Sequence, residues 1–146
     1  MDRRERQEQD GARAYFFPSL APDDLRAVST LGLAHMGDAV FELLVRSWLC
    51  VHGRAAGRDL HKDCVALVRA ESQAARAERI VPLLTDEERA AYRRGRNAQP
   101  HSIPPHATRA QYAAATALEA LLGWLYLQGR RERIEELFAV MMEGER

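Results

Sequence analysis

The sequence has no apolar run close to the roughly 20 residues that a membrane-spanning helix needs. Its first residues, MDRRERQEQD, also lack the apolar core of a secretion signal. Only two cysteines are present, Cys50 and Cys64, which are too few for a disulfide scaffold and lack the spacing of zinc ligands. These absences exclude membrane and secreted classes, and we expect buried thiols in a reducing, cytoplasmic environment.

An excess of charge is also absent, because 21 Lys and Arg balance 21 Asp and Glu. Bulk electrostatics therefore does not indicate a nucleic-acid partner, and such a partner would require a local basic patch. Lys62 is the single lysine, so any patch must consist of arginine, which binds phosphate well. With 146 residues, 47% of them hydrophobic and 29% charged, the chain has the size and balance of one globular domain.

Scarce β-branched residues and abundant alanine predict helices between residues 23 and 143, with no sustained alternation typical of strands. Glycine and proline divide this stretch into expected helices over about 30–51, 57–80, 86–95, 108–127 and 131–142, with a further helix start at residues 22–24. Residues 97–106 contain three prolines and are expected to form a loop. We predict an all-α, single-domain helical bundle over residues 23–146, preceded by a charged, partly disordered N-terminus over residues 1–22.

Two acidic residues stand among apolar neighbours in these helices. Asp38 lies in the run HMGDAVF and Glu119 in the run ALEALLGW. An ionised carboxylate is costly in such surroundings unless a positive charge compensates its desolvation. Gly37 and Gly123 each cost about 1 kcal/mol relative to alanine in a helix interior and suggest close backbone approach. Alternatively, both acids face solvent between apolar stripes, and spacing alone does not separate the two interpretations.

Three short motifs resemble the ribonuclease III family. Residues 33–42, LAHMGDAVFE, are similar to its signature helix with a glycine-aspartate-alanine-valine core, and residues 116–123, TALEALLG, to its second acidic helix. Residues 93–98, RRGRNA, resemble an arginine-glycine-arginine-asparagine element of one branch, Mini-ribonuclease III. That branch consists of the nuclease domain without a double-stranded-RNA-binding domain. The resemblance covers about residues 25–142 and implies that the predicted domain is a ribonuclease III-like nuclease.

The resemblance implies that Asp38 and Glu119 are catalytic residues that hold Mg2+, for which Mn2+ can substitute. Carboxylate oxygens suit these hard cations, and such ions can activate water and stabilise a leaving oxygen. His35 and Glu42, each about one helical turn from Asp38, are candidates for supporting positions around the metal. Packing for His35 and solvent exposure for Glu42 are the commoner roles.

Two acids of the full-length family are missing. Ala34 stands where a glutamate precedes the aspartate by four residues, and Thr116 where an acid precedes the second glutamate by three. Mini-ribonuclease III resembles this chain in having the reduced pair. Retained waters can complete the coordination of Mg2+, and Thr116 is a candidate for a supporting position.

Two basic clusters are candidates for RNA contacts. One would form a stripe within an arc of about 40° on a continuous helix: Arg58, Lys62, Arg69 and Arg76. This stripe either binds RNA or is an ordinary solvent-exposed helix face. The other lies at a helix end, where guanidinium groups can reach phosphates, and is the one we favour: Arg89, Arg93, Arg94 and Arg96, followed by Asn97. Double-stranded RNA is recognised mainly by shape, phosphates and 2′-hydroxyls, which such sparse contacts can supply.

We therefore expect a Mg2+-dependent endoribonuclease that hydrolyses double-stranded RNA to 5′-phosphate products. The resemblance implies a cytoplasmic homodimer that matures the precursor of the large-subunit (23S) ribosomal RNA. Met36, Val40 and Phe41 are candidates for the dimer interface, with ordinary core as the alternative. No membrane partner is expected, and a ribosomal protein partner cannot be derived. The rival functions are a catalytically inactive RNA-binding or ribosome-associated protein with the same fold, and a small protein-interaction module.

Overall fold

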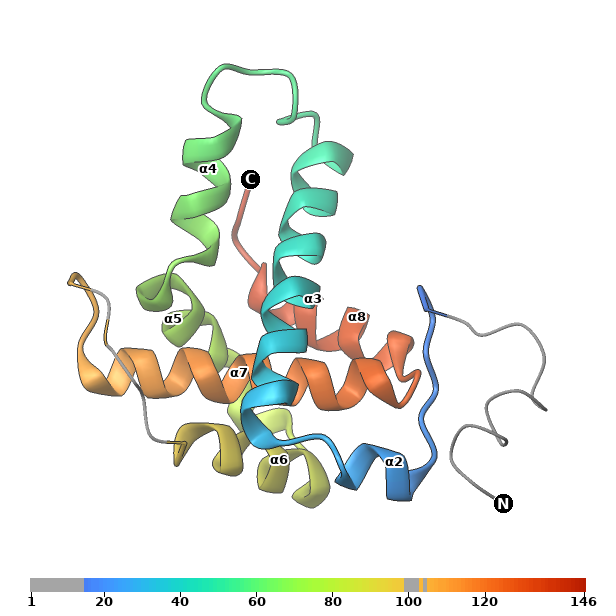
Figure 1. The fold of residues 1–146 in the computed structure, drawn as a ribbon. Helices are drawn as coiled ribbons and strands as arrows, with labels where there is room; N and C mark the ends of the chain where they lie inside the picture. The colour runs from blue at the N-terminus through green and yellow to red at the C-terminus, as the bar shows by residue number, and fades with distance from the viewer. Residues whose placement is uncertain (1–14, 99–102, 104) are drawn as a thin grey trace.

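The computed structural model describes residues 15–98, 103 and 105–146, which form helices and turns without a β-strand (Figure 1). The elements are α2 (Pro22–Arg26), α3 (Thr30–Val51), α4 (Leu60–Val68), α5 (Ala70–Ile80), the 3-10 helix η1 (Val81–Leu83), α6 (Asp86–Arg96), α7 (Arg109–Leu127) and α8 (Arg131–Met141). The predicted all-α, single-domain fold is confirmed. Most of the expected N-terminal segment and part of the expected loop at 97–106 lie outside the described residues. In the described part of the chain, no helix has the length and hydropathy to cross a membrane.

Local signals explain where the main helices begin and end. Ser29 accepts a hydrogen bond from the backbone N–H of Gly32 at the start of α3. Thr85 and Thr108 begin capping boxes at α6 and α7, in which the third helical residue bonds back to the threonine N–H. Gly129 follows α7 with a φ of 76°, a left-handed conformation that stops the helix without strain. These boundaries agree with those expected from the sequence.

The single helix expected over residues 57–80 is wrong. Arg69 adopts an extended backbone with φ −65° and ψ 157°, and this residue separates α4 from α5. The side chain of Gln73 donates to the carbonyl oxygen of Val68, one of the groups that the interruption frees. In Figure 1, α4 therefore runs beside the C-terminal half of α3, whereas α5 turns toward α7.

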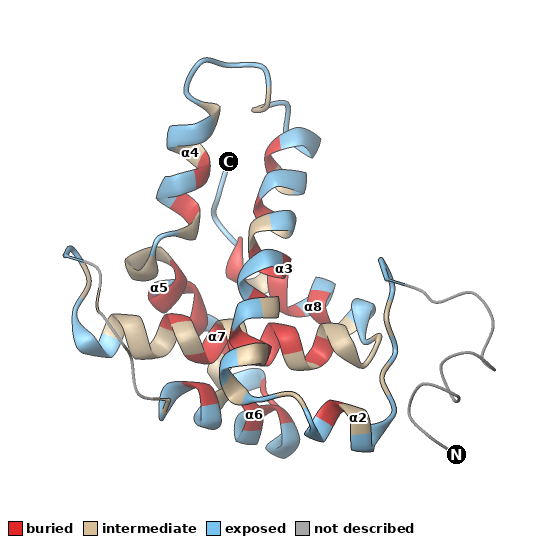
Figure 2. Ribbon diagram, in the orientation of Figure 1, coloured by how far each residue is buried: buried red, intermediate tan, exposed pale blue. Residues whose placement is uncertain are grey.

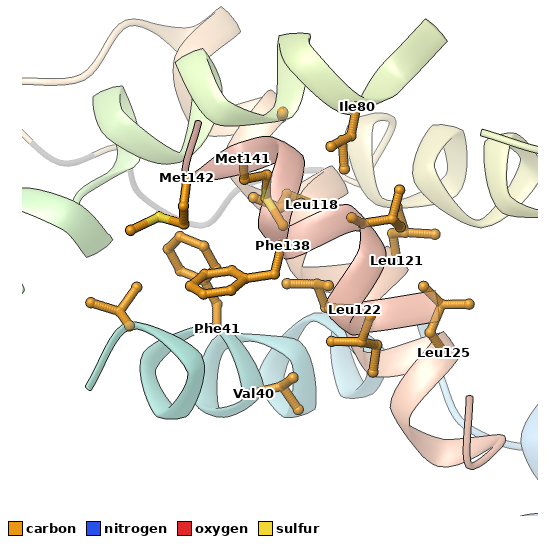
Figure 3. Close-up of a cluster of buried hydrophobic side chains, with 14 of the residues drawn as sticks. Val40, Phe41, Ile80, Leu118, Leu121, Leu122, Leu125, Phe138, Met141 and Met142 are labelled. Atoms are coloured by element: carbon orange, nitrogen blue, oxygen red, sulfur yellow. The ribbon is translucent and has the colours of Figure 1, made fainter. Parts of the chain in front are cut away.

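The central helix of the bundle is α7, which packs against α3, α5 and α6. Because neighbours cover it on several sides, its buried residues are small or apolar: Ala115, Ala117, Leu118, Ala120, Leu121, Leu122, Gly123 and Leu125. Figure 3 shows the leucines of α7 packed with Phe41 of α3 and Phe138 of α8. Figure 2 shows buried residues along α7 and on the helices packed against it, whereas α4 buries its residues on the side nearest α3. Glu119 is the acidic residue of this largely covered helix.

Candidate functional site

The backbones of α3 and α7 touch where the two helices cross. A Cβ atom on Gly37 would lie 1.6 Å from the carbonyl oxygen of Glu119. Reciprocally, a Cβ atom on Gly123 would lie 2.0 Å from the carbonyl oxygen of Leu33. Real Cβ atoms essentially never approach within 3.0 Å, so a side chain at either position would force the helices apart. The close approach expected from the two glycines is confirmed.

This crossing brings Asp38 of α3 next to Glu119 of α7. Asp38 is exposed, and Glu119 is half-buried. Burial, the neighbouring Asp38 charge and a hydrogen bond between the two side chains raise the pKa of Glu119 to about 8. At neutral pH Glu119 therefore retains its proton. The alternative in which the two acids face solvent independently does not describe this site.

The chemistry of the pair fits a divalent cation. Carboxylate oxygens are ligands that Mg2+ and Mn2+ prefer, and a cation between them would offset the burial and the Asp38 charge that together raise the pKa of Glu119. Among the described residues, no three His, Cys, Asp or Glu side chains are grouped so that they could hold a metal. A cation bound here would therefore keep several waters or take further oxygens from a substrate.

The two positions that lack a family acid differ in their surroundings. Ala34 is buried in a small apolar cluster that includes Leu25. Thr116 is half-buried one turn before Glu119, and its hydroxyl donates a hydrogen bond of 3.0 Å to a backbone carbonyl of the preceding turn. Because that bond uses the hydroxyl proton, the oxygen lone pairs of Thr116 stay available. A supporting position at the metal therefore remains a prediction for Thr116, and an oxygen ligand at residue 34 would not fit its apolar surroundings.

The other two supporting candidates lie on α3. His35 is exposed one turn before Asp38, and its role remains a prediction. Glu42 already forms an ion pair with Arg46, with 2.6 Å between Oε1 and Nη2. That partner competes with a metal for the Glu42 carboxylate, so the geometry gives no added support to Glu42.

The arginines at the end of α6 form an exposed basic surface. Arg93, Arg94 and Arg96 are exposed in its last turn, and Asn97 follows at the C-cap. Within residues 15–98, 103 and 105–146, none of the three arginines forms an ion pair with a carboxylate. Cations at a helix C-terminus interact favourably with the helix dipole. These side chains are therefore available to an anionic partner, although contact with RNA remains a prediction.

The other predicted RNA surface is not a continuous stripe. Arg58 lies in the turn before α4, Lys62 on α4 and Arg69 at the break, all exposed. Arg76 is buried, and its guanidinium donates to a carbonyl at the end of α8 at 2.8 Å and to Glu145 at 2.7 Å. The RNA-contact prediction is therefore wrong for Arg76, whose charge holds the C-terminal residues. For the other three it remains a prediction.

The interface candidates on α3 also need correction. Val40 and Phe41 are buried in the main core of a single chain, with exposed fractions of 5% and 0%. They cannot contact a second copy without unfolding, so their assignment to an interface is wrong and the alternative of ordinary core is correct. Met36 is half-buried against the same core.

Sequence reasoning missed a buried ion pair that anchors α6. Glu88 is fully buried and accepts hydrogen bonds from Nε and Nη2 of Arg133, each 2.9 Å long. It also accepts from the backbone N–H of Thr85 as part of the capping box. These bonds, led by those from Arg133, hold the pKa of Glu88 below its usual range despite burial. The capping-box spacing of Thr85 and Glu88 was the available sequence signal, and it says nothing of the distant arginine.

Comparison with known proteins identifies relatives of this chain. The Ribonuclease III domain family matches residues 31–130. The chain is 45% identical over 107 residues to a Mini-ribonuclease 3 from Symbiobacterium thermophilum, covering 73% of this chain and 82% of that protein. It is 47% identical over 126 residues to a Mini-ribonuclease 3 from Synechocystis, covering 84% and 86%. A crystal structure of a Fusobacterium nucleatum protein superposes with a TM-score of 0.74 at 31% identity, covering 84% of this chain and 98% of that one. The chain therefore belongs to the ribonuclease III family of endoribonucleases, and within it to the Mini-ribonuclease 3 branch.

Proposed function

We propose that this endoribonuclease cleaves double-stranded RNA and depends on Mg2+, with Mn2+ able to replace it. The observation that carries the metal dependence is the Asp38–Glu119 pair, in which two hard oxygen ligands lie side by side, and burial together with the Asp38 charge raises the pKa of Glu119. Two adjacent carboxylates favour binding of a cation more than two acids that are separated by solvent.

The pair supplies the chemistry as follows. Asp38 and Glu119 would hold the cation through their oxygens, and Thr116, one turn before Glu119, would contact a water of its shell. A divalent cation lowers the pKa of a bound water and stabilises charge on the phosphate and on the leaving 3′ oxygen. Because the raised pKa keeps a proton on Glu119 at neutral pH, binding of a cation there would be coupled to release of that proton. Hydrolysis leaves 5′-phosphate and 3′-hydroxyl ends.

The exposed arginines of α6 are our candidates for the RNA-binding surface. Replacing Arg94 and Arg96 by alanine should weaken binding and lower the salt dependence by about one unit of slope for each phosphate that is no longer neutralised. The measurement is fluorescence anisotropy with a duplex at several salt concentrations in EDTA. An unchanged slope would transfer the RNA surface to the exposed residues Arg58, Lys62 and Arg69.

We further propose a homodimer, because a duplex has two strands and the proposed site in each chain is the single pair Asp38 and Glu119. Two such pairs facing one duplex would leave short 3′ overhangs. Sedimentation at micromolar concentration tests this assembly, and a monomer with full double-strand cleavage would refute it. The precursor of 23S ribosomal RNA as substrate, and the cytoplasm as location, are proposed from the branch to which the chain belongs rather than from geometry.

The decisive experiment compares long duplex RNA with its separate strands, each incubated with Mg2+, with Mn2+ or with EDTA. We expect cleavage of the duplex with either metal and none in EDTA. Asp38→Asn should abolish cleavage and leave duplex binding intact, because the arginines are untouched. If the wild-type protein binds the duplex but cuts it with neither metal, the alternative of a catalytically inactive RNA-binding protein replaces this proposal.

A further inference from the structure

The glycine of the arginine-glycine-arginine-asparagine element has a contact of its own. A Cβ atom on Gly95 would lie 2.7 Å from Cβ of Ala120, 2.8 Å from Cα of Ala117 and 2.9 Å from the carbonyl oxygen of Thr116. Two of these three atoms belong to the backbone of α7 and cannot move away by a change of rotamer. The end of α6 therefore lies directly on α7, over the turns that include Glu119.

The beginning of α6 is held just as firmly. The buried Glu88–Arg133 pair joins its first turn to α8, and Arg133 also donates to the carbonyl oxygen of Leu83 at 2.9 Å. Thr85 closes the same turn through its capping box. With an ion pair at one end and a backbone contact at the other, α6 has little freedom to slide or rotate on α7.

The arginines project on both sides of this contact. Arg94 lines a cavity of about 780 Å³ together with Ser29 and Thr30 at the start of α3. Arg96 lines a separate cavity beside Arg109 and Tyr112 of α7. Gly95 lies between the two arginines in the chain and faces the turns of α7 that carry Glu119. A displacement at this one residue would therefore move both guanidinium groups relative to the carboxylate pair.

We propose that Gly95 is a positioning residue, whose missing side chain sets the register between the basic surface of α6 and the Asp38–Glu119 pair. The inference rests on the proposed function, because it treats that surface as the place where RNA phosphates bind. It adds that the distance between RNA-binding and cleaving groups is built into a helix contact rather than adjusted by the RNA.

Gly95→Ala tests the proposal. Ordinary Cβ contacts begin at 3.4 Å, so contacts of 2.7–2.9 Å require α6 to withdraw by at least about 0.5 Å. Misplacement by about 1 Å can lower a rate about a hundredfold. We therefore expect kcat on duplex RNA to fall at least about tenfold. Affinity for the duplex in EDTA should stay within about threefold, because every arginine remains on α6.

This division of effects separates positioning from binding and from stability. Arg94→Ala should raise KM instead, and Ala90→Leu, which adds bulk at an exposed position of α6, should alter neither constant. Gly95→Ala combined with Ala120→Gly removes the nearest clash and should recover part of kcat. The kcat values are normalised to the folded fraction from circular dichroism, so loss of folding alone is not counted as loss of rate.

Two results would overturn the proposal: an unchanged kcat in folded Gly95→Ala, or a loss of affinity that matches the loss of rate. If Gly95→Ala does not fold, Glu88→Gln loosens the other end of α6 without adding bulk. It should lower kcat at least about threefold at constant affinity, and an unchanged kcat would overturn the proposal equally. Failure of the proposed function is distinguishable, because the wild-type protein would then not cleave the duplex at all.

Discussion

Replacing Glu119 by glutamine should stabilise the metal-free protein, increasingly so as the pH rises. In the folded protein, burial and Asp38 raise the pKa of Glu119 from an ordinary 4.5 to about 8. Between these two values the folded state binds more protons than the unfolded state. The free energy of unfolding therefore falls as the pH rises above 4.5, and the loss is complete only once the pH exceeds about 8. Glutamine does not titrate and is free of this loss.

The size of the effect follows from the same pKa values. A pKa of about 8 against 4.5 corresponds to at most about 5 kcal/mol once the group is ionised in both states. Glu119 is half-buried and its partner is exposed, so screening by solvent should reduce this to about 2–3 kcal/mol at pH 9. At pH 5 the difference between wild type and variant should be below about 1 kcal/mol.

Urea unfolding in EDTA at pH 5, 7 and 9, followed by circular dichroism, measures this difference. Glu135→Gln, at an exposed position of α8, is the matched control and should not change the pH dependence. Mg2+ should then stabilise the wild-type protein more than Glu119→Gln, because only the wild type offers two carboxylates to the ion. A difference in stability that stays constant from pH 5 to pH 9 would refute the reasoning, as would a variant that is less stable at pH 9.

Other substitutions test the packing around the pair. Gly37→Ala should destabilise the protein by at least about 2 kcal/mol, because its Cβ would lie 1.6 Å from a carbonyl oxygen of α7. It should also weaken Mg2+ binding, which calorimetry measures. Gly57→Ala is the control, because the nearest atom to its Cβ would be 3.9 Å away. Thr116→Asp should strengthen Mg2+ binding, because Thr116 lies one turn before Glu119. Ala34→Glu should lower the free energy of unfolding in urea by at least about 2 kcal/mol, since residue 34 is buried among apolar side chains. If the two variants changed Mg2+ binding and stability equally, this distinction would be wrong. Arg133→Ala should cost about 3–5 kcal/mol by leaving a buried carboxylate unpaired, and a destabilisation below about 1 kcal/mol would show that the pair is dispensable.

Features governed by neighbouring residues could be predicted from the sequence. The start of α3 at Ser29 and the end of α7 near Gly129 depend on one capping group and one left-handed glycine, both local. The approach of α3 to α7 could be predicted because glycine destabilises a helix interior, so Gly37 and Gly123 indicate that another backbone lies close. Such signals require no knowledge of the rest of the fold.

Features that depend on distant partners could not be predicted in the same way. Arg76 has the spacing of a surface cation, yet it is buried because carbonyl and carboxylate oxygens at the far end of the chain satisfy it. From its sequence position Glu88 is likewise expected to be a solvent-exposed capping residue. Its burial depends on Arg133, which lies 45 positions away in the chain. A charged side chain is buried only where the fold brings an oppositely charged or hydrogen-bonding group beside it. Helical periodicity contains no information on that distant group.

The composition of α7 follows from its two close neighbours. On one side α7 packs against α3 at Gly37, and this contact brings the two carboxylates together. On the other side α7 packs against α6 at Gly95. Both approaches require small residues on α7, and Ala120 and Gly123 stand one turn apart to meet them. Glu119 lies beside these positions, so a larger residue at either one displaces a neighbouring helix from the carboxylate. The small residues Ala120 and Gly123 are therefore a requirement of the proposed chemistry as well as of packing, because they let α6 and α3 lie close to the helix that carries Glu119.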